Sequence, residues 1–205
     1  MALSIDKRRT AFLSMHFLND LVHEDGRFAV SGTAAHAKQT NCLANKKNVL
    51  DACRRMNVHV IHVDIGIAEA GRTLISSIPV GPLFKGIVET GAFTEGTWGA
   101  EIHEEVKPHE GEFVVTGRAP NSFYSTDLER ILRGLDIRTV VLSGVATNMV
   151  VESTTRYACD ALYEVIILRD CCASFSEEMH SFTLDNVLPN LATVSNSEEF
   201  IRALG

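Results

Sequence analysis

The segment SGVATNMVVESTTRYA, residues 143–158, indicates the fold class of this chain. A run of β-branched residues at 139–141 ends at Gly144, and Thr147 or Asn148 is predicted to cap the helix that follows. In α/β proteins, ligands bind where the carboxyl end of a strand meets the amino end of a helix. The segment therefore predicts a strand, a turn and a helix at a ligand-binding position.

Apolar runs alternate with segments of helical period along the rest of the chain. We predict strands at 10–17, 58–65, 112–116, 139–145, 164–170 and 192–195, and helices at 37–56, 98–106, 125–135, 149–162, 176–188 and 197–204. Single helices between strands imply right-handed crossovers, and hence a parallel sheet with helices on both faces. The sequence thus predicts one domain, residues 1–205, with a doubly wound three-layer α/β/α fold around a mostly parallel six-stranded sheet.

Residues 66–97 have no clear period, and a connection of that length is typical of a functional lid or an oligomer contact. In a doubly wound fold, the ligand lies outside the carboxyl ends of the strands. The ligand is therefore expected at the strand ends 16–20, 64–66, 116–122, 144–148 and 170–174.

The composition argues against several classes of partner. The formal charge is −7, and the 19 Lys and Arg residues are scattered, so no basic face for nucleic acid is predicted. The run NKKNV at 45–49 is interpreted as a solvated helix face. The apolar N-terminal segment is too short and too interrupted to span a membrane, and five cysteines without a CxxC spacing fit reduced, packed thiols. We expect a cytoplasmic protein.

Cofactor sites are not predicted either. No GxGxxG or GxxxxGK[ST] motif follows a strand, so a nucleotide would lack its usual backbone cradle. The eight histidines are spread along the chain, and no cluster of His, Cys or carboxylate residues has metal-ligand spacing. The sequence predicts neither a cofactor nor a metal.

Four segments in a fixed order carry a resemblance to a known family. They are AFLSMHFLNDLV, GTWGAEIHEEVKPHEGEFVVTGR, NSFYSTDLERILRGLDIRTVVLSGVATNMVVESTTRYA and VIILRDCCASFSEEMHSF. Together they resemble the isochorismatase-like hydrolases, the superfamily of nicotinamidases, N-carbamoylsarcosine amidohydrolases and isochorismatases. The resemblance covers residues 9–203.

The resemblance implies a catalytic set of an aspartate, a lysine and a cysteine for amide hydrolysis. In this chain the aspartate position falls on His16, the lysine position on Gly117 with Arg118 beside it, and the cysteine position on Val150. Valine has no nucleophile, so thioester chemistry at that position is impossible. The resemblance also implies a non-proline cis peptide before Ala146, which would direct the amides of Ala146 and Val150 towards the pocket as an anion hole.

One hypothesis is a hydrolase with a rebuilt centre. His16 would activate water as the base, with Asp64 or Asp20 orienting its ring and Arg118 replacing the lost cation. The substrate would be a small amide, ureido compound or enol ether, attacked without metal and without an acyl-enzyme. We assign catalytic roles to His16, Arg118, Ala146 and Val150, and substrate contacts to Asn19, Asp64, Gly117, Tyr124 and Thr147.

Each of these residues also has a structural interpretation. His16 would be a neutral histidine that fills the space of the aspartate and bonds to a backbone carbonyl, and Arg118 would be a surface residue. Asn19 and Asp20 would close the loop after the first strand by side-chain to backbone bonds, and Tyr124 would pack. Cys171 and Cys172 end a strand on the same edge, but free thiols are more often small buried hydrophobes.

The second hypothesis is a catalytically inactive member that binds a small metabolite or serves as an assembly subunit. Loss of all three reacting residues with retention of the packing motifs is what relaxed selection on chemistry would leave. In both cases the expected partner is a small molecule, with no nucleic acid and no membrane. Members of the family assemble as dimers or tetramers, and the apolar residues of 66–97 are consistent with such a homo-oligomer.

Overall fold

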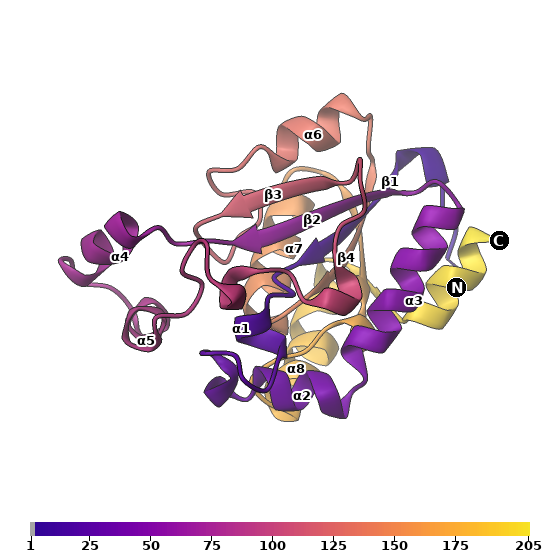
Figure 1. The fold of residues 1–205 in the computed structure, drawn as a ribbon. Helices are drawn as coiled ribbons and strands as arrows, with labels where there is room; N and C mark the ends of the chain where they lie inside the picture. Colours follow the sequence, from indigo (N-terminus) through magenta and orange to yellow (C-terminus); the bar gives the residue numbers. More distant parts are fainter. Residues whose placement is uncertain (1–2) are drawn as a thin grey trace.

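The computed structural model describes residues 3–205, which form an α/β fold around one parallel sheet (Figure 1). The strands are β1 (Thr10–Met15), β2 (His59–Ile65), β3 (Phe113–Gly117), β4 (Thr139–Gly144), β5 (Glu164–Leu168) and β6 (Thr193–Ser195). Their order in the sheet is β3-β2-β1-β4-β5-β6, and every neighbouring pair is parallel. The predicted doubly wound fold is confirmed, with the winding reversing between β1 and β4.

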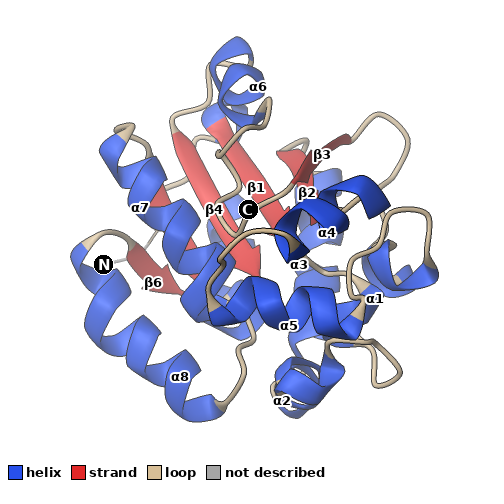
Figure 2. Cartoon of the chain, turned by 90° about the vertical axis from the view of Figure 1, so that its left-hand side faces the viewer, coloured by secondary structure: helices blue, strands red, loops and turns tan. Residues whose placement is uncertain are grey.

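Helices cover both faces of the sheet (Figures 1 and 2). The helices are α1 (Asn19–Val22), α2 (Thr33–Gln39), α3 (Cys42–Arg55), α4 (Glu69–Ser76), α5 (Pro82–Thr90), α6 (Leu128–Gly134), α7 (Glu152–Asp160), α8 (Glu177–Phe182) and α9 (Ser197–Leu204). Apolar residues of α3 and α9 pack on one face of the sheet, and those of α6 and α7 pack on the other. None of the helices between residues 3 and 205 combines the length and apolarity needed to cross a membrane.

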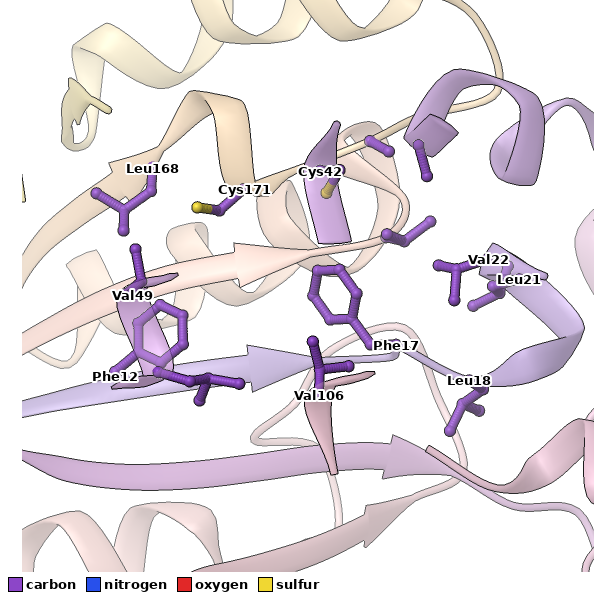
Figure 3. Close-up of a cluster of buried hydrophobic side chains, with 14 of the residues drawn as sticks. Phe12, Phe17, Leu18, Leu21, Val22, Cys42, Val49, Val106, Leu168 and Cys171 are labelled. Carbon is purple, nitrogen blue, oxygen red and sulfur yellow. The ribbon is translucent and has the colours of Figure 1, made fainter. Parts of the chain in front are cut away.

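The central strands are apolar along their whole length because both of their faces are covered. All six residues of β1 are buried, and alternate side chains enter opposite core clusters. Phe12 packs towards α3, whereas Ala11 and Leu13 pack towards α6 and α7. Figure 3 shows part of the hydrophobic core on the face of the sheet that α3 covers. Phe17, just after β1, lies there between Cys42 and Val106.

Several predicted helices are wrong in extent. The helix predicted at 37–56 is two helices, because Asn41 adopts a left-handed conformation with φ of 53° between α2 and α3. The helix predicted at 98–106 is two 3-10 turns, Trp98–Ala100 and Glu104–Val106. The segment 66–97, which lacked a clear period, contains α4 and α5.

Helices α4 and α5 extend beyond the carboxyl ends of the strands, away from the layered body (Figure 1). Arg72 on α4 joins them: its guanidinium donates to the carbonyls of Ile87 (2.8 Å) and Ala92 (2.6 Å). Leu74 and Ile78 remain exposed in this segment. The oligomer contact proposed for it stays a prediction.

Candidate functional site

A small apolar cavity lies at the point where the winding reverses. It opens between the end of β1 and the turn after β4, under the side chains of α5. Its volume of about 40 Å³ leaves room for two or three water molecules. The lining residues are His16, Leu21, Phe28, Ile65, Leu83, Phe84, Ile87, Phe93, Pro120, Val145, Ala146, Met149, Val150 and Phe175.

His16 supplies the polar group of this cavity. It follows β1 directly, and its backbone N–H donates to the Val63 carbonyl (2.7 Å), which continues the β1–β2 hydrogen bonding by one residue. Its φ of 57° lies in the left-handed region, which histidine tolerates better than most residues, and this conformation ends the strand. The side chain is buried, and no described residue hydrogen-bonds to its Nε2.

Burial also sets the charge of His16. Loss of hydration lowers the pKa of its imidazole to about 4, so the ring is neutral at pH 7. A neutral imidazole presents one donor and one acceptor nitrogen. The unpartnered Nε2 of His16 can therefore donate or accept one hydrogen bond, depending on which ring nitrogen carries the proton.

This depressed pKa predicts acid sensitivity. Below about pH 6.5 the unfolded chain protonates His16 while the folded protein does not until about pH 4, so the stability conferred by the neutral ring falls as the pH falls between these values. The expected slope from this residue is up to about 1.4 kcal/mol per pH unit. Urea unfolding of wild type and His16→Asn from pH 7 to 4 measures it, since asparagine also tolerates positive φ.

The difference between the two proteins isolates His16, because His180, whose pKa burial also lowers to about 4, titrates in both. As the pH is lowered from 7 to 4, we expect the free energy of unfolding to fall more steeply in wild type than in His16→Asn. Parallel curves for the two proteins would mean that His16 is hydrated in solution.

The turn after β4 forms the opposite wall of the cavity. The peptide between Val145 and Ala146 is cis, as the resemblance implied, and a π-helical turn follows at Thr147–Val151. The Thr147 amide donates to the Ala173 carbonyl (2.8 Å), whereas the Ala146 amide bonds to no backbone carbonyl of the described residues. Val150 is fully buried against the cavity.

The predicted cap of the helix after this turn is wrong, because neither Thr147 nor Asn148 caps it. The Thr147 hydroxyl instead lies 3.0 Å from the Ala173 carbonyl and 2.8 Å from His180 Nδ1, and Asn148 Oδ1 accepts from Ser174 (2.6 Å). Both side chains hold the turn against the segment after β5.

Three of the predicted catalytic residues meet at the cavity, and the fourth does not. His16, Ala146 and Val150 line it, and their catalytic roles remain predictions. The Arg118 guanidinium pairs with Glu95 (2.6 Å) and donates to the Gly66 carbonyl, so it is not available as the replacement cation in this arrangement.

The residues predicted to contact substrate lie outside this cavity in the structure. Asn19 donates to the Trp98 carbonyl (2.8 Å), Gly117 accepts from the Gly66 amide, and Thr147 bonds as described above. Burial raises the pKa of Asp64, and neither its Oδ1 nor His16 Nε2 has a hydrogen-bond partner among the described residues, so the two are not bonded through these atoms. Tyr124, expected to pack, is exposed and lines a shallow groove beside Pro120 and Met149.

Asp20 organises the site in a way that the sequence only partly indicated. We predicted that its side chain would close the loop after β1. It reaches further: one carboxylate oxygen accepts from the Arg27 amide (2.9 Å) and the other from the Phe93 amide (2.7 Å). Gly99 packs against the same carboxylate, where a Cβ atom would overlap it. Asp20 therefore positions Phe93 and, beside it, Phe28 on the cavity wall.

Other reactive side chains are sealed in the core. Ser14, His62 and Glu112 form a hydrogen-bonded series (3.2 and 2.9 Å) like that of a serine hydrolase, but Ser14 and His62 are buried between β1, β2 and α3. Burial raises the pKa of Cys171 and raises that of Cys172 to about 12, so neither thiol is activated. The packing interpretation of these two cysteines fits the structure.

A wider hollow of about 750 Å³ lies on α1, α2 and α3. It is open, alanines make up five of its fourteen lining residues, and none of the predicted site residues lines it. We place the candidate site in the smaller cavity because that cavity lies at the carboxyl ends of β1 and β4, where the fold binds ligands.

Comparison with known proteins agrees with this geometry. The isochorismatase domain model matches residues 10–199. The chain belongs to the isochorismatase family. It is 30% identical over 199 residues to the isochorismatase family protein YwoC of Bacillus subtilis, covering 97% of this chain and 96% of that protein.

Two further family members are similar over nearly the whole chain. The ureidoacrylate amidohydrolase RutB of Rhizobium rhizogenes is 29% identical, over 97% of this chain and 80% of its own. The crystal structure of an isochorismatase-like hydrolase from Alkaliphilus metalliredigens superposes with a TM-score of 0.78 at 28% identity, over 96% of this chain and 99% of that one. The family and fold of this chain are therefore those expected from its motifs.

Proposed function

We propose that this family member binds a small molecule in the cavity between His16 and the Ala146 turn and does not hydrolyse it through a thioester. The observation that carries the proposal is the lining of the cavity. Among the residues that line it there is no Cys, Ser, Thr, Lys, Asp or Glu, so no lining side chain can form a thioester, and His16 is the one that carries a nucleophilic atom.

The family motifs support the same conclusion. We infer that His16, Gly117 and Val150 occupy the positions of the catalytic aspartate, lysine and cysteine. His16 and Val150 face the cavity, and Gly117 ends β3. A protein with these substitutions keeps the pocket of the family and lacks its reacting groups.

The proposal predicts that small amides, ureido compounds and enol ethers are not turned over. We expect no product above the uncatalysed rate, and no mass increase of the intact protein after incubation, because no acyl-enzyme forms. Family-type turnover, on the order of 1 s⁻¹ or faster, or an adduct near the Ala146 turn would contradict the proposal.

A triple variant provides the positive control. His16→Asp, Gly117→Lys and Val150→Cys together restore the inferred catalytic set, and the local geometry at positions 16 and 117 is compatible with the first two changes. A Cβ at Gly117 would meet its nearest neighbours at 3.5 Å or more, and aspartate tolerates the left-handed conformation of residue 16. We expect this variant to form an acyl-enzyme with amides that leave wild type unmodified.

A second candidate function is hydrolysis by water attack, and the unpaired Nε2 of His16 is the observation that favours it. A water on Nε2 would transfer a proton to the ring as its oxygen attacks the substrate carbonyl, with the Ala146 amide bonding to the oxyanion. Because the pKa of His16 is about 4, the base is weak, and the rate would rise up to about pH 5 and then stay constant.

His16→Ala separates the two candidates. Turnover in wild type that is lost in His16→Ala, with the expected pH profile, would establish the second function in place of the first. Equal rates for the two proteins would remove His16 as a base.

A further inference from the structure

The wall of the cavity carries no charge. Of the fourteen residues that line it, thirteen are apolar, and the exception is His16, whose ring is neutral at pH 7. One similar protein, RutB of Rhizobium rhizogenes, is an amidohydrolase of ureidoacrylate, which is an anion. A cavity of this composition offers no cation for such a ligand.

The arginines around the cavity are already bonded. Arg118 pairs with Glu95 (2.6 Å), and neither residue lines the cavity. Arg72 is buried, and its guanidinium donates hydrogen bonds to the carbonyls of Ile87 and Ala92, which fixes the loop after α5. Neither guanidinium can turn to a ligand without breaking these bonds.

The energetic balance disfavours an anion. Transfer of a carboxylate from water into an apolar site costs several kcal/mol even after relaxation. A hydrogen bond to a charged acceptor returns about 1.5 to 3 kcal/mol, and the Ala146 amide, which bonds to no backbone carbonyl of the described residues, could donate one such bond. An uncharged head group loses less hydration and can be satisfied by His16 and this amide.

We propose that the cavity selects an uncharged, mostly apolar molecule with one polar head group bonded to His16 Nε2, and that it rejects the anion of the same shape. This inference rests on the proposed function, because it specifies the ligand of the same site. The branched and aromatic side chains on the wall fit an aliphatic or aromatic body of a few carbon atoms.

The cavity is too small to hold a ligand unless its wall moves. Its volume of about 40 Å³ is far below the roughly 300 Å³ at the lower end of ligand pockets. Leu83 and Phe84 of α5 are among the half-buried residues of the wall, and we expect their side chains to move when the ligand enters. We therefore expect the bound ligand to contact Leu83 and Phe84 of α5.

Isobutyramide and isobutyrate form a suitable pair of probes, because they have the same shape and differ in charge at pH 7.5. Binding is followed in the full-length protein by NMR of ¹³C-methyl methionine. Met149 lines the cavity, whereas Met179 is exposed on α8 and Met56 follows α3. Met149→Leu assigns the reporter signal.

We expect isobutyramide to shift the Met149 signal and leave those of Met56 and Met179 in place, with at least tenfold higher affinity than isobutyrate. Arg118→Ala should leave this ratio unchanged, because Arg118 is not part of the binding wall. A loss of isobutyrate binding in Arg118→Ala would show that a cation reaches the cavity and would overturn the inference.

The remaining outcomes separate the inference from the function on which it rests. Equal or tighter binding of isobutyrate, with a shift at Met149, would overturn the selectivity and leave ligand binding at this site intact. No shift at Met149 with either probe, nor with the larger pair benzamide and benzoate, would overturn both proposals. The unchanged Met56 signal reports that the protein is folded in each case.

Discussion

Replacing Asp20 with alanine is expected to lower the free energy of unfolding by about 3 to 6 kcal/mol. The carboxylate is buried and accepts from the amides of Arg27 and Phe93, and each hydrogen bond to a charged group contributes about 1.5 to 3 kcal/mol. Removal of the side chain leaves both amides without their acceptor. Urea unfolding monitored by circular dichroism measures the loss.

The same substitution is expected to disorganise the cavity. Phe93 has a φ of 58°, a left-handed conformation that is costly for a bulky residue, and the Asp20 carboxylate holds its amide there. Phe93 also packs on Phe28, with ring centroids 5.5 Å apart. Isobutyramide should therefore bind Asp20→Ala at least tenfold more weakly than wild type, under conditions in which the variant is folded.

Asp25→Ala is the matched control, since Asp25 is an exposed carboxylate in the same loop. Its effect should stay within about 0.5 kcal/mol, as for other surface substitutions. Asp20→Asn keeps one carbonyl oxygen, so its loss of unfolding free energy should lie between those of Asp20→Ala and Asp25→Ala. An Asp20→Ala variant as stable as Asp25→Ala would refute the role assigned to this carboxylate.

Replacing Lys46 with methionine is expected to stabilise the protein by about 1 to 4 kcal/mol at pH 7. Lys46 is fully buried on α3, its Nζ lies 3.6 Å from the centroid of the Phe17 ring, and it has no hydrogen-bond partner among the described residues. Methionine fills similar space without an amine to desolvate. The interpretation of 45–49 as a solvated face is thus wrong for Lys46.

The stabilisation by Lys46→Met should decrease as the pH rises. Burial lowers the pKa of Lys46 well below its ordinary value, so between the lowered pKa and about 10.4 the unfolded chain binds a proton that the folded protein lacks. The stability of wild type relative to Lys46→Met therefore rises with pH, by up to about 1.4 kcal/mol per unit. The advantage of the variant should shrink towards pH 10.

The titratable groups around the amine are the same residues in both proteins. Cys42, Cys171, Glu112 and Arg54 surround the amine, and all are present in both proteins. Lys47→Met, at the exposed neighbouring position, serves as the control and should leave both stability and its pH dependence nearly unchanged. A destabilised Lys46→Met, or a gain independent of pH, would mean that the amine is charged and solvated.

The sequence predicted the parts of the site that local patterns determine. Alternation of apolar strands with helical segments fixes a parallel sheet, and a parallel sheet places the ends of neighbouring strands at one edge. His16, Ala146 and Val150 follow two such strands, and they lie together on the cavity wall. The last helix, at 197–204, has the predicted bounds because its cap and its apolar period are local features of the sequence.

Tertiary structure alone decided which side chains serve the cavity. Asp20 bonds to a residue 73 positions away, Arg118 turns to Glu95, and Lys46 is buried although its neighbour Lys47 is exposed. Hydrophobic period and turn signals act within about ten residues, so they carry no information on which distant segments meet. The packing of α4, α5 and the loops around β1 sets the partners of these charges, and thereby leaves the cavity uncharged.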